Sequence, residues 1–156
     1  MYRRTSVQDG RVNGRQTARM EEQRSKIAVV VRDDLAGWQR LNVTAFLVSG
    51  IAATYPETIG VEYEDASDVR YLPMFGLPVL VYAADADAIR TAHRKALDRE
   101  LGMAIYTEEL FATGNDVDNR AAVRAVPTEK LALVGIAVHG SRNAVDKTLK
   151  GLTLHP

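Results

Sequence analysis

The chain has 156 residues, of which 46% are hydrophobic and 26% charged, and its 20 basic side chains balance 20 acidic ones. This length and composition predict a globular protein with one domain and a core of its own. The absence of cysteine excludes disulfides and thiolate metal sites, and no apolar stretch is long enough to span a membrane. We therefore expect a cytoplasmic protein without a cofactor and without a membrane partner, and its neutrality does not favour a polyanionic partner.

The neutral total hides an uneven distribution of charge. Residues 1–25 contain six arginines and three acidic residues, a net charge of +3, so residues 26–156 carry a net −3. Few large apolar side chains occur in the first segment, and such a segment cannot offset its ordering entropy by burial. We predict a flexible basic tail over residues 1–25 and a single α/β domain over residues 26–156. A nucleic-acid-binding arm and an organelle transit peptide are the alternatives for the tail.

The β-branched run from Ile27 to Val31 predicts a central strand buried on both faces. A helix is expected from about Ala36 to Ala53, and its apolar side chains surround nearly the whole circumference. A helix of this kind must be covered on all sides. We expect the sheet to cover one side and a second subunit the other, which predicts a homodimer.

The rest of the chain alternates between strand and helix patterns. A hairpin is expected over 59–64 and 69–72, around a turn at 65–68. Further strands are predicted at 79–82, 103–106, 131–138 and 152–154, and helices from Asp85 or Asp87 to about 100, at 116–126 and from 140–141 to 150–151. This order predicts an α/β fold in which helices flank a mixed, mostly parallel sheet of about four to six strands.

The first candidate site follows the first strand, at Arg32, Asp33 and Asp34. Ligands of open α/β sheets gather outside the carboxyl ends of parallel strands. Arg32 could pair with a carboxylate or phosphate, and Asp33 or Asp34 could hold a water or a ligand hydroxyl. The alternative is that one aspartate only caps the helix.

Three further groups of polar or aromatic residues are expected at the same crevice. Each has a structural alternative as a helix cap, a backbone hydrogen-bonder or a partner of the helix dipole. The groups are Trp38, Asn42 and Thr44 on the first helix, Thr107, Glu108 and Glu109 after a strand, and Ser141, Arg142 and Asn143 at a helix start. Together they predict a site for a small polar or anionic ligand, with Asp33 and Glu108 as candidate catalytic residues.

A basic helix face and three histidines complete the candidates. Arg90, Arg94, Lys95 and Arg99 could contact RNA, although such a face is more often solvated. The histidines His93, His139 and His155 lack metal-ligand spacing, and we expect no metal site.

Several stretches of the chain carry a resemblance to a known family. They are 26–34 (KIAVVVRDD), 38–44 (WQRLNVT), 71–75 (YLPMF), 106–114 (YTEELFATG) and 142–147 (RNAVDK). Over residues 26–156 the chain resembles the uncharacterised bacterial family described as domain of unknown function 2000. That family is similar in turn to the archaeal and eukaryotic type of peptidyl-tRNA hydrolase. The resemblance implies a small α/β sandwich that is usually dimeric. If the activity of the hydrolases is also retained, the resemblance implies hydrolysis of an ester.

The catalytic residues of those hydrolases have few counterparts in this chain. Their first helix carries a lysine, glutamine and histidine series, where this chain has Gln39 to Leu41, Ala45 and Val48, with Arg40 as a nearby cation. Their Asp-Ala-Gly motif is replaced by Thr107-Glu108-Glu109. A ligand-binding module is therefore our leading interpretation. The alternatives are a hydrolase that uses Asp33 or Glu108 as general base and an RNA-binding module.

Overall fold

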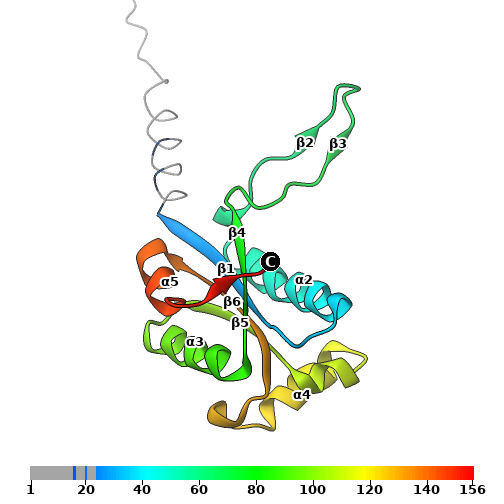
Figure 1. Cartoon of the computed structure of the whole chain (residues 1–156). Coiled ribbons are helices and arrows are strands. Elements are labelled where there is room, and N and C mark those ends of the chain that lie inside the picture. Colours follow the sequence, from blue (N-terminus) through cyan, green and yellow to red (C-terminus); the bar gives the residue numbers. More distant parts are fainter. Residues whose placement is uncertain (1–15, 17–19, 21–23) are drawn as a thin grey trace, which may run out of the picture.

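The computed structural model describes Gln16, Met20 and residues 24–156. The predicted basic tail over residues 1–25 lies almost entirely outside the described residues. Within them the chain forms four α-helices and two sheets (Figure 1). The strands are β1 (Ser25–Arg32), β2 (Tyr63–Glu64), β3 (Arg70–Tyr71), β4 (Val79–Ala84), β5 (Gly102–Thr107), β6 (Leu133–Ser141) and β7 (Thr153–Leu154). The helices are α2 (Gly37–Thr54), α3 (Ala86–Asp98), α4 (Asp116–Arg124) and α5 (Arg142–Thr148), with short 3-10 turns at Pro56–Thr58, Glu108–Ala112 and Thr128–Lys130.

The main sheet has five strands in the order β5-β6-β1-β4-β7, so the predicted mixed α/β fold is confirmed. The expectation of a mostly parallel sheet is wrong. Only β1 and β4 pair in parallel, and the other three pairings are antiparallel. The physical reason lies in the segment between β5 and β6, whose ends meet where the Glu108 amide donates to the Ala132 carbonyl at 2.9 Å. The segment therefore starts and finishes at the same end of the sheet. Because β6 begins where β5 ends, the two neighbouring strands must run antiparallel.

This topology decides which strand ends lie together. β1, β4 and β5 point the same way, so Arg32, Ala84 and Thr107 end at one edge of the sheet. β6 points the other way, and Ser141 pairs with Ser25 at the opposite edge. Strand ends that look equivalent in the sequence therefore lie on two sides of the protein.

Helices cover both faces of the sheet, with α2 on one face and α3 and α5 on the other (Figure 1). The side chains of Ile27 to Val31 are fully buried, as the β-branched run predicts, and they alternate between the two core layers. α2 lies over β1, β5 and β6. It leaves β4 and β7 without a helix on its own face.

Within the described residues the sheet covers one side of α2, as expected. Val43, Leu47 and Ile51 are buried against the sheet. Trp38, Leu41 and Phe46 are 64%, 76% and 54% exposed. A single sheet can cover only one side of a helix, and no other described element lies over the outer side. A second subunit on that side remains a prediction.

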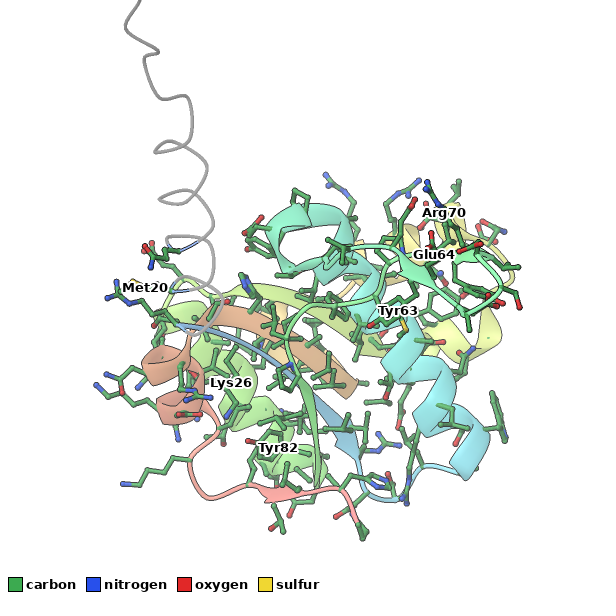
Figure 2. The ribbon with its side chains drawn as sticks, turned by 90° about the horizontal axis from the view of Figure 1, so that it is seen from above. Met20, Lys26, Tyr63, Glu64, Arg70 and Tyr82 are labelled. Atoms are coloured by element: carbon green, nitrogen blue, oxygen red, sulfur yellow. The ribbon has the colours of Figure 1, made fainter. Side chains whose placement is uncertain are left out.

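The predicted hairpin is confirmed, because β2 and β3 pair Tyr63 with Tyr71 and Glu64 with Arg70. Its turn is closed by Asp65, whose Oδ1 accepts the amides of Ser67 and Val69 at 2.8 and 3.1 Å. We call residues 59–75 the arm. The arm extends away from the body of the protein (Figure 1), and residues 61–72 are all exposed. Figure 2 shows Tyr63, Glu64 and Arg70 on the arm, on the α2 side of the sheet, and Lys26 and Tyr82 on the other side.

Candidate functional site

The structure brings Arg32, Asp34 and Glu108 together at the carboxyl edge of β1 and β5. The Arg32 Nε donates to Oδ1 of Asp34 and its Nη1 donates to Oε1 of Glu108, both at 2.5 Å. Burial by itself would lower the pKa of Arg32, but the hydrogen bonds to Asp34 and Glu108 raise it above its ordinary value. Two carboxylates thus neutralise the guanidinium, which makes Arg32 a poor receptor for an external anion.

Aromatic side chains of α2, β5 and the 3-10 turn Glu108–Ala112 pack against one another. Trp38 lies edge-on to Phe111 with ring centroids 6.0 Å apart, and Phe111 lies 5.1 Å from Tyr106. The Tyr106 hydroxyl donates to Oδ1 of Asn42 at 3.5 Å. Thr107 is buried and its Oγ1 has no hydrogen-bond partner among the described residues. Tyr106 and Phe111 were not among the residues predicted from the sequence, where they look like ordinary core positions.

The expectation of one crevice lined by three loops is wrong. Ser141, Arg142 and Asn143 lie at the opposite edge of the sheet from Glu108. The eight residues of β1 separate the two edges, which at about 3.3 Å per residue is on the order of 25 Å. Ser141 caps α5 by accepting the Ala144 amide at 3.3 Å. Arg142 and Glu108 therefore cannot contact the same small ligand.

The remaining sequence candidates lie near the carboxyl edge in separate roles. Asp33 and Glu109 have exposed side chains. The Thr44 hydroxyl donates to the Arg40 carbonyl at 2.8 Å, a bond within α2. Because Arg32 occupies an oxygen of Glu108, that carboxylate is less available as a general base than its sequence position suggests.

An open groove runs between α2 and the uncovered strands β4 and β7. Its volume is about 810 Å³. Its apolar walls come from both sides: Val31, Val79, Val81 and Leu154 from the sheet, and Gly37, Leu41 and Ala45 from α2. The polar lining residues are Arg40, Thr44 and His155. The groove exists because α2 lies over the β5 side of the sheet and leaves β4 and β7 bare.

Arg40 lies in this groove. Its Nε donates to the Leu35 carbonyl at 2.9 Å and its Nη2 to the Asp33 carbonyl at 2.5 Å. Its Nη1 lies 2.9 Å from Nε2 of His155, whose Nδ1 lies 2.8 Å from the backbone oxygen of Pro156. An arginine can only donate, so Nε2 is the acceptor in this contact. Within residues 24–156 no carboxylate forms an ion pair with Arg40, and two of its five N–H groups have no protein partner.

A family model described as a protein of unknown function (DUF2000) matches residues 25–156. The chain belongs to the DUF2000 family. A solved structure, the protein of unknown function Atu0240 from Agrobacterium tumefaciens strain C58, is similar to it, with 45% identity and a TM-score of 0.82. The match covers 85% of this chain and 98% of that one. No curated protein matches the chain.

A second open cavity in this DUF2000 protein lies between α2, β5 and α4, with a volume of about 750 Å³. Phe46 and Tyr106 form an aromatic wall, and Asn119, Arg120 and Arg124 lie at its rim. Arg120 forms an ion pair with Asp116. Arg124, which has no ion pair within residues 24–156, is exposed to solvent, whereas Arg40 in the groove is half-buried.

The other sequence candidates receive little geometric support in the DUF2000 fold. On the predicted RNA-binding face, Arg90 pairs with Asp87 at 3.3 Å. Over the described part of the chain, no three or more acidic or histidine side chains cluster closely enough to hold a metal ion. Nor does any helix in that part have the length and apolarity needed to cross a membrane.

Proposed function

We propose that this protein is a binding module for a small ligand that has an anionic head and an apolar body. The head, most simply a carboxylate, binds to Arg40, and the body lies in the groove between α2 and the strands β4 and β7. This keeps the ligand class expected from the sequence but moves the site from the Arg32 cluster to the groove.

The carrying observation is the uncompensated charge of Arg40. Its three hydrogen bonds to the protein go to two backbone carbonyls and a ring nitrogen of His155, none of which is a carboxylate. Burying part of a cation costs free energy unless an anion pairs with it. The two unused N–H groups can donate to such an anion with charge-assisted hydrogen bonds.

The walls of the groove supply the second half of the specificity. They consist mainly of Val, Leu and Ala side chains on rigid elements. Small-molecule sites in proteins commonly combine such apolar walls with a few convergent polar groups. A ligand with both parts is therefore favoured over a free inorganic anion or a neutral hydrocarbon.

Octanoate tests this proposal, with octan-1-ol and acetate as controls. Octanoate should raise the melting temperature, because a ligand at a hundred times its Kd adds about 2.7 kcal/mol to the free energy of unfolding. Octan-1-ol lacks the charge and acetate lacks the apolar body, so each should have a much smaller effect. A protein that octanoate does not stabilise would contradict the proposal.

Substitutions at Arg40 locate the site. Arg40→Gln should weaken octanoate binding at least about tenfold, since a hydrogen bond to a charged group contributes about 1.5–3 kcal/mol. Arg40→Lys keeps the charge and should retain part of the affinity. Arg94→Gln is the matched control, because Arg94 is exposed on α3, on the opposite face of the sheet. Equal binding by Arg40→Gln and the control would place the ligand elsewhere.

We further infer that the architecture is that of the archaeal and eukaryotic type of peptidyl-tRNA hydrolase. In support, β1 ends at Arg32 and is followed by Asp33 and a long helix, and α5 carries Asp146 and Lys147 before the short strand β7. Superposition on such a hydrolase should give the same strand order and the same strand directions. A different position or direction of β6 would contradict the inference.

A further inference from the structure

The outer face of α2 is apolar, exposed and free of charge. We define it by Trp38, Phe46, Ser49 and Ala53, all of which are exposed, and Leu41 and Ala45 lie between this face and the groove. Arg40 is the one charged residue of this 18-residue helix, and its guanidinium points to the groove rather than to this face. An apolar stripe of this length on a helix normally packs against another element.

The arm adds a second exposed surface of a different kind. It contains four acidic residues and one basic residue, a net charge of −3, which equals the whole net charge of residues 26–156. It also exposes large apolar side chains, with Val61 86% and Leu72 83% exposed. A hairpin with so few paired residues and both faces in water is marginally stable by itself.

The exposed apolar area is of the size that a stable dimer needs. Trp38 and Phe46 on α2 and Tyr63 and Tyr71 on the arm are between 49% and 64% exposed. With about 200 Å² for each aromatic side chain, these four contribute roughly 400 Å². A stable interface buries about 800 Å² on each partner. The exposed aliphatic side chains of the arm and of α2 supply much of the remainder.

We propose that the outer face of α2 packs against α2 of a second copy of this chain, antiparallel and about a twofold axis, and that each arm lies over the amino end of the other copy's α2. Three observations favour a second copy over an unrelated partner. The first is the absence of charge on the face, because residues near a twofold axis meet their own copies and like charges there would repel.

The second observation is the position of the arm. The arm begins five residues after the end of α2. When two helices pack antiparallel, the carboxyl end of one lies beside the amino end of the other. The same twofold axis that joins the α2 faces therefore brings each arm to the first turn of the partner's α2.

The third observation is charge complementarity at that point. A helix amino terminus carries a partial positive charge. The first turn of α2 contains no acidic residue to compensate it. The arm brings a net −3 to this positive end. A second copy thus covers the apolar face and brings acidic residues to a helix amino terminus that has none of its own.

Sedimentation of the full chain tests the proposal, which predicts a dimer. Phe46→Glu and Ser49→Glu should each raise the dimer dissociation constant by about tenfold or more, because they bury a carboxylate in an apolar interface. Ser49 is exposed, so its substitution removes no core contact and separates dimer loss from misfolding. Val117→Glu is the matched control on α4, where Val117 is 66% exposed, and should leave the dimer intact.

Cross-linking tests the antiparallel arrangement, since a chain without cysteine gives single-cysteine variants a clean background. Ala45→Cys or Ser49→Cys, near the middle of α2, should form an interchain disulfide under mild oxidation, and Val117→Cys should not. A monomeric chain, a dimer that survives both glutamate substitutions on α2, or equal cross-linking at position 117 would each overturn the proposal.

Discussion

The Arg40 guanidinium and the His155 ring join α2 to the carboxyl-terminal segment, with Nη1 and Nε2 2.9 Å apart. The His155 amide also donates to the Val81 carbonyl at 2.9 Å, which continues the pairing of β7 with β4. The short strand β7 is therefore held from two sides, by the edge of the sheet and by α2.

Loss of this contact should loosen the carboxyl-terminal segment. In Arg40→Gln the shorter neutral side chain cannot reach the Asp33 carbonyl and His155 together. We expect faster amide hydrogen exchange at Leu154 and His155, with little change at the core strand β1. Unchanged exchange at these two amides would show that pairing with β4 alone holds the segment.

Gly135 should be intolerant of a side chain because α2 packs directly on β6 there. A Cβ at this position would lie 2.7 Å from Cγ1 of Val43 and 3.1 Å from Cδ1 of Leu47. Gly135→Ala should lower the free energy of unfolding by about 1–3 kcal/mol, the usual cost of overpacking a core. The matched control is Gly114→Ala, where a Cβ meets nothing within 4 Å. Equal denaturation midpoints for the two variants would contradict this account.

The ion pair between Lys26 and Asp146 should stabilise the fold up to high pH. Lys26 Nζ lies 2.5 Å from Asp146 Oδ1, and the lysine side chain is only 14% exposed. Burial would lower the pKa of Lys26, but the hydrogen bonds to Asp146 and Tyr82 raise it above its ordinary value. A raised pKa stabilises the fold below the ordinary lysine pKa, and this contribution is lost as the pH rises through the folded value.

Asp146→Asn should therefore cost about 1–2 kcal/mol at neutral pH, a figure reduced by the half-exposed carboxylate. Denaturant unfolding at about pH 8 and above about pH 11, on either side of the ordinary lysine pKa of about 10.4, measures the effect. The difference between the variant and the native protein should shrink at the higher pH. A difference that is the same at both values would rule out the ion pair as its source.

Two buried histidines should make the fold less stable in acid. Burial lowers the pKa of His93 and of His139, although Glu57 opposes the shift at His139. Below about pH 6.5 the unfolded chain takes up protons that these folded side chains do not bind, so the free energy of unfolding falls as the pH falls.

His139→Phe should reduce this acid dependence. The ring of His139 lies 4.2 Å from that of Tyr55, a contact that phenylalanine can keep, and its Nε2 is buried without a partner in residues 24–156. Unfolding by denaturant between about pH 7 and pH 5 measures the slope on both sides of the histidine pKa. A slope as steep as that of the native protein would assign the acid sensitivity to other groups.

Local patterns predicted those elements whose formation depends on neighbours in the chain. The run of Ile27 to Val31 is buried in the sheet, and Asp65 closes the turn of the hairpin within four residues. Asp85, one of two predicted caps, accepts the Ala88 amide at 2.8 Å at the start of α3. In each case the deciding interaction lies within one turn or one strand, so the sequence contains it.

The candidate site was predictable only in part. The order of elements suggested that Arg32 and Glu108 would meet, and they do, but the same reasoning placed Arg142 beside them. The direction of β6 decides between these outcomes, and it depends on where the chain returns after a segment of more than twenty residues. The sequence of β6 does not predict the direction in which the strand runs.

The amino-acid sequence by itself determined the class of this protein: an α/β domain with a buried first strand, an apolar first helix and a hairpin. These properties follow from side-chain type and spacing. Only the tertiary structure decided that α2 covers half of one sheet face. This position of α2 leaves Arg40 and His155 in an open groove and leaves the outer face of α2 exposed. Val79, His155 and Arg40 lie far apart in the chain, and their meeting depends on strand order and direction, which arise from packing across the whole domain.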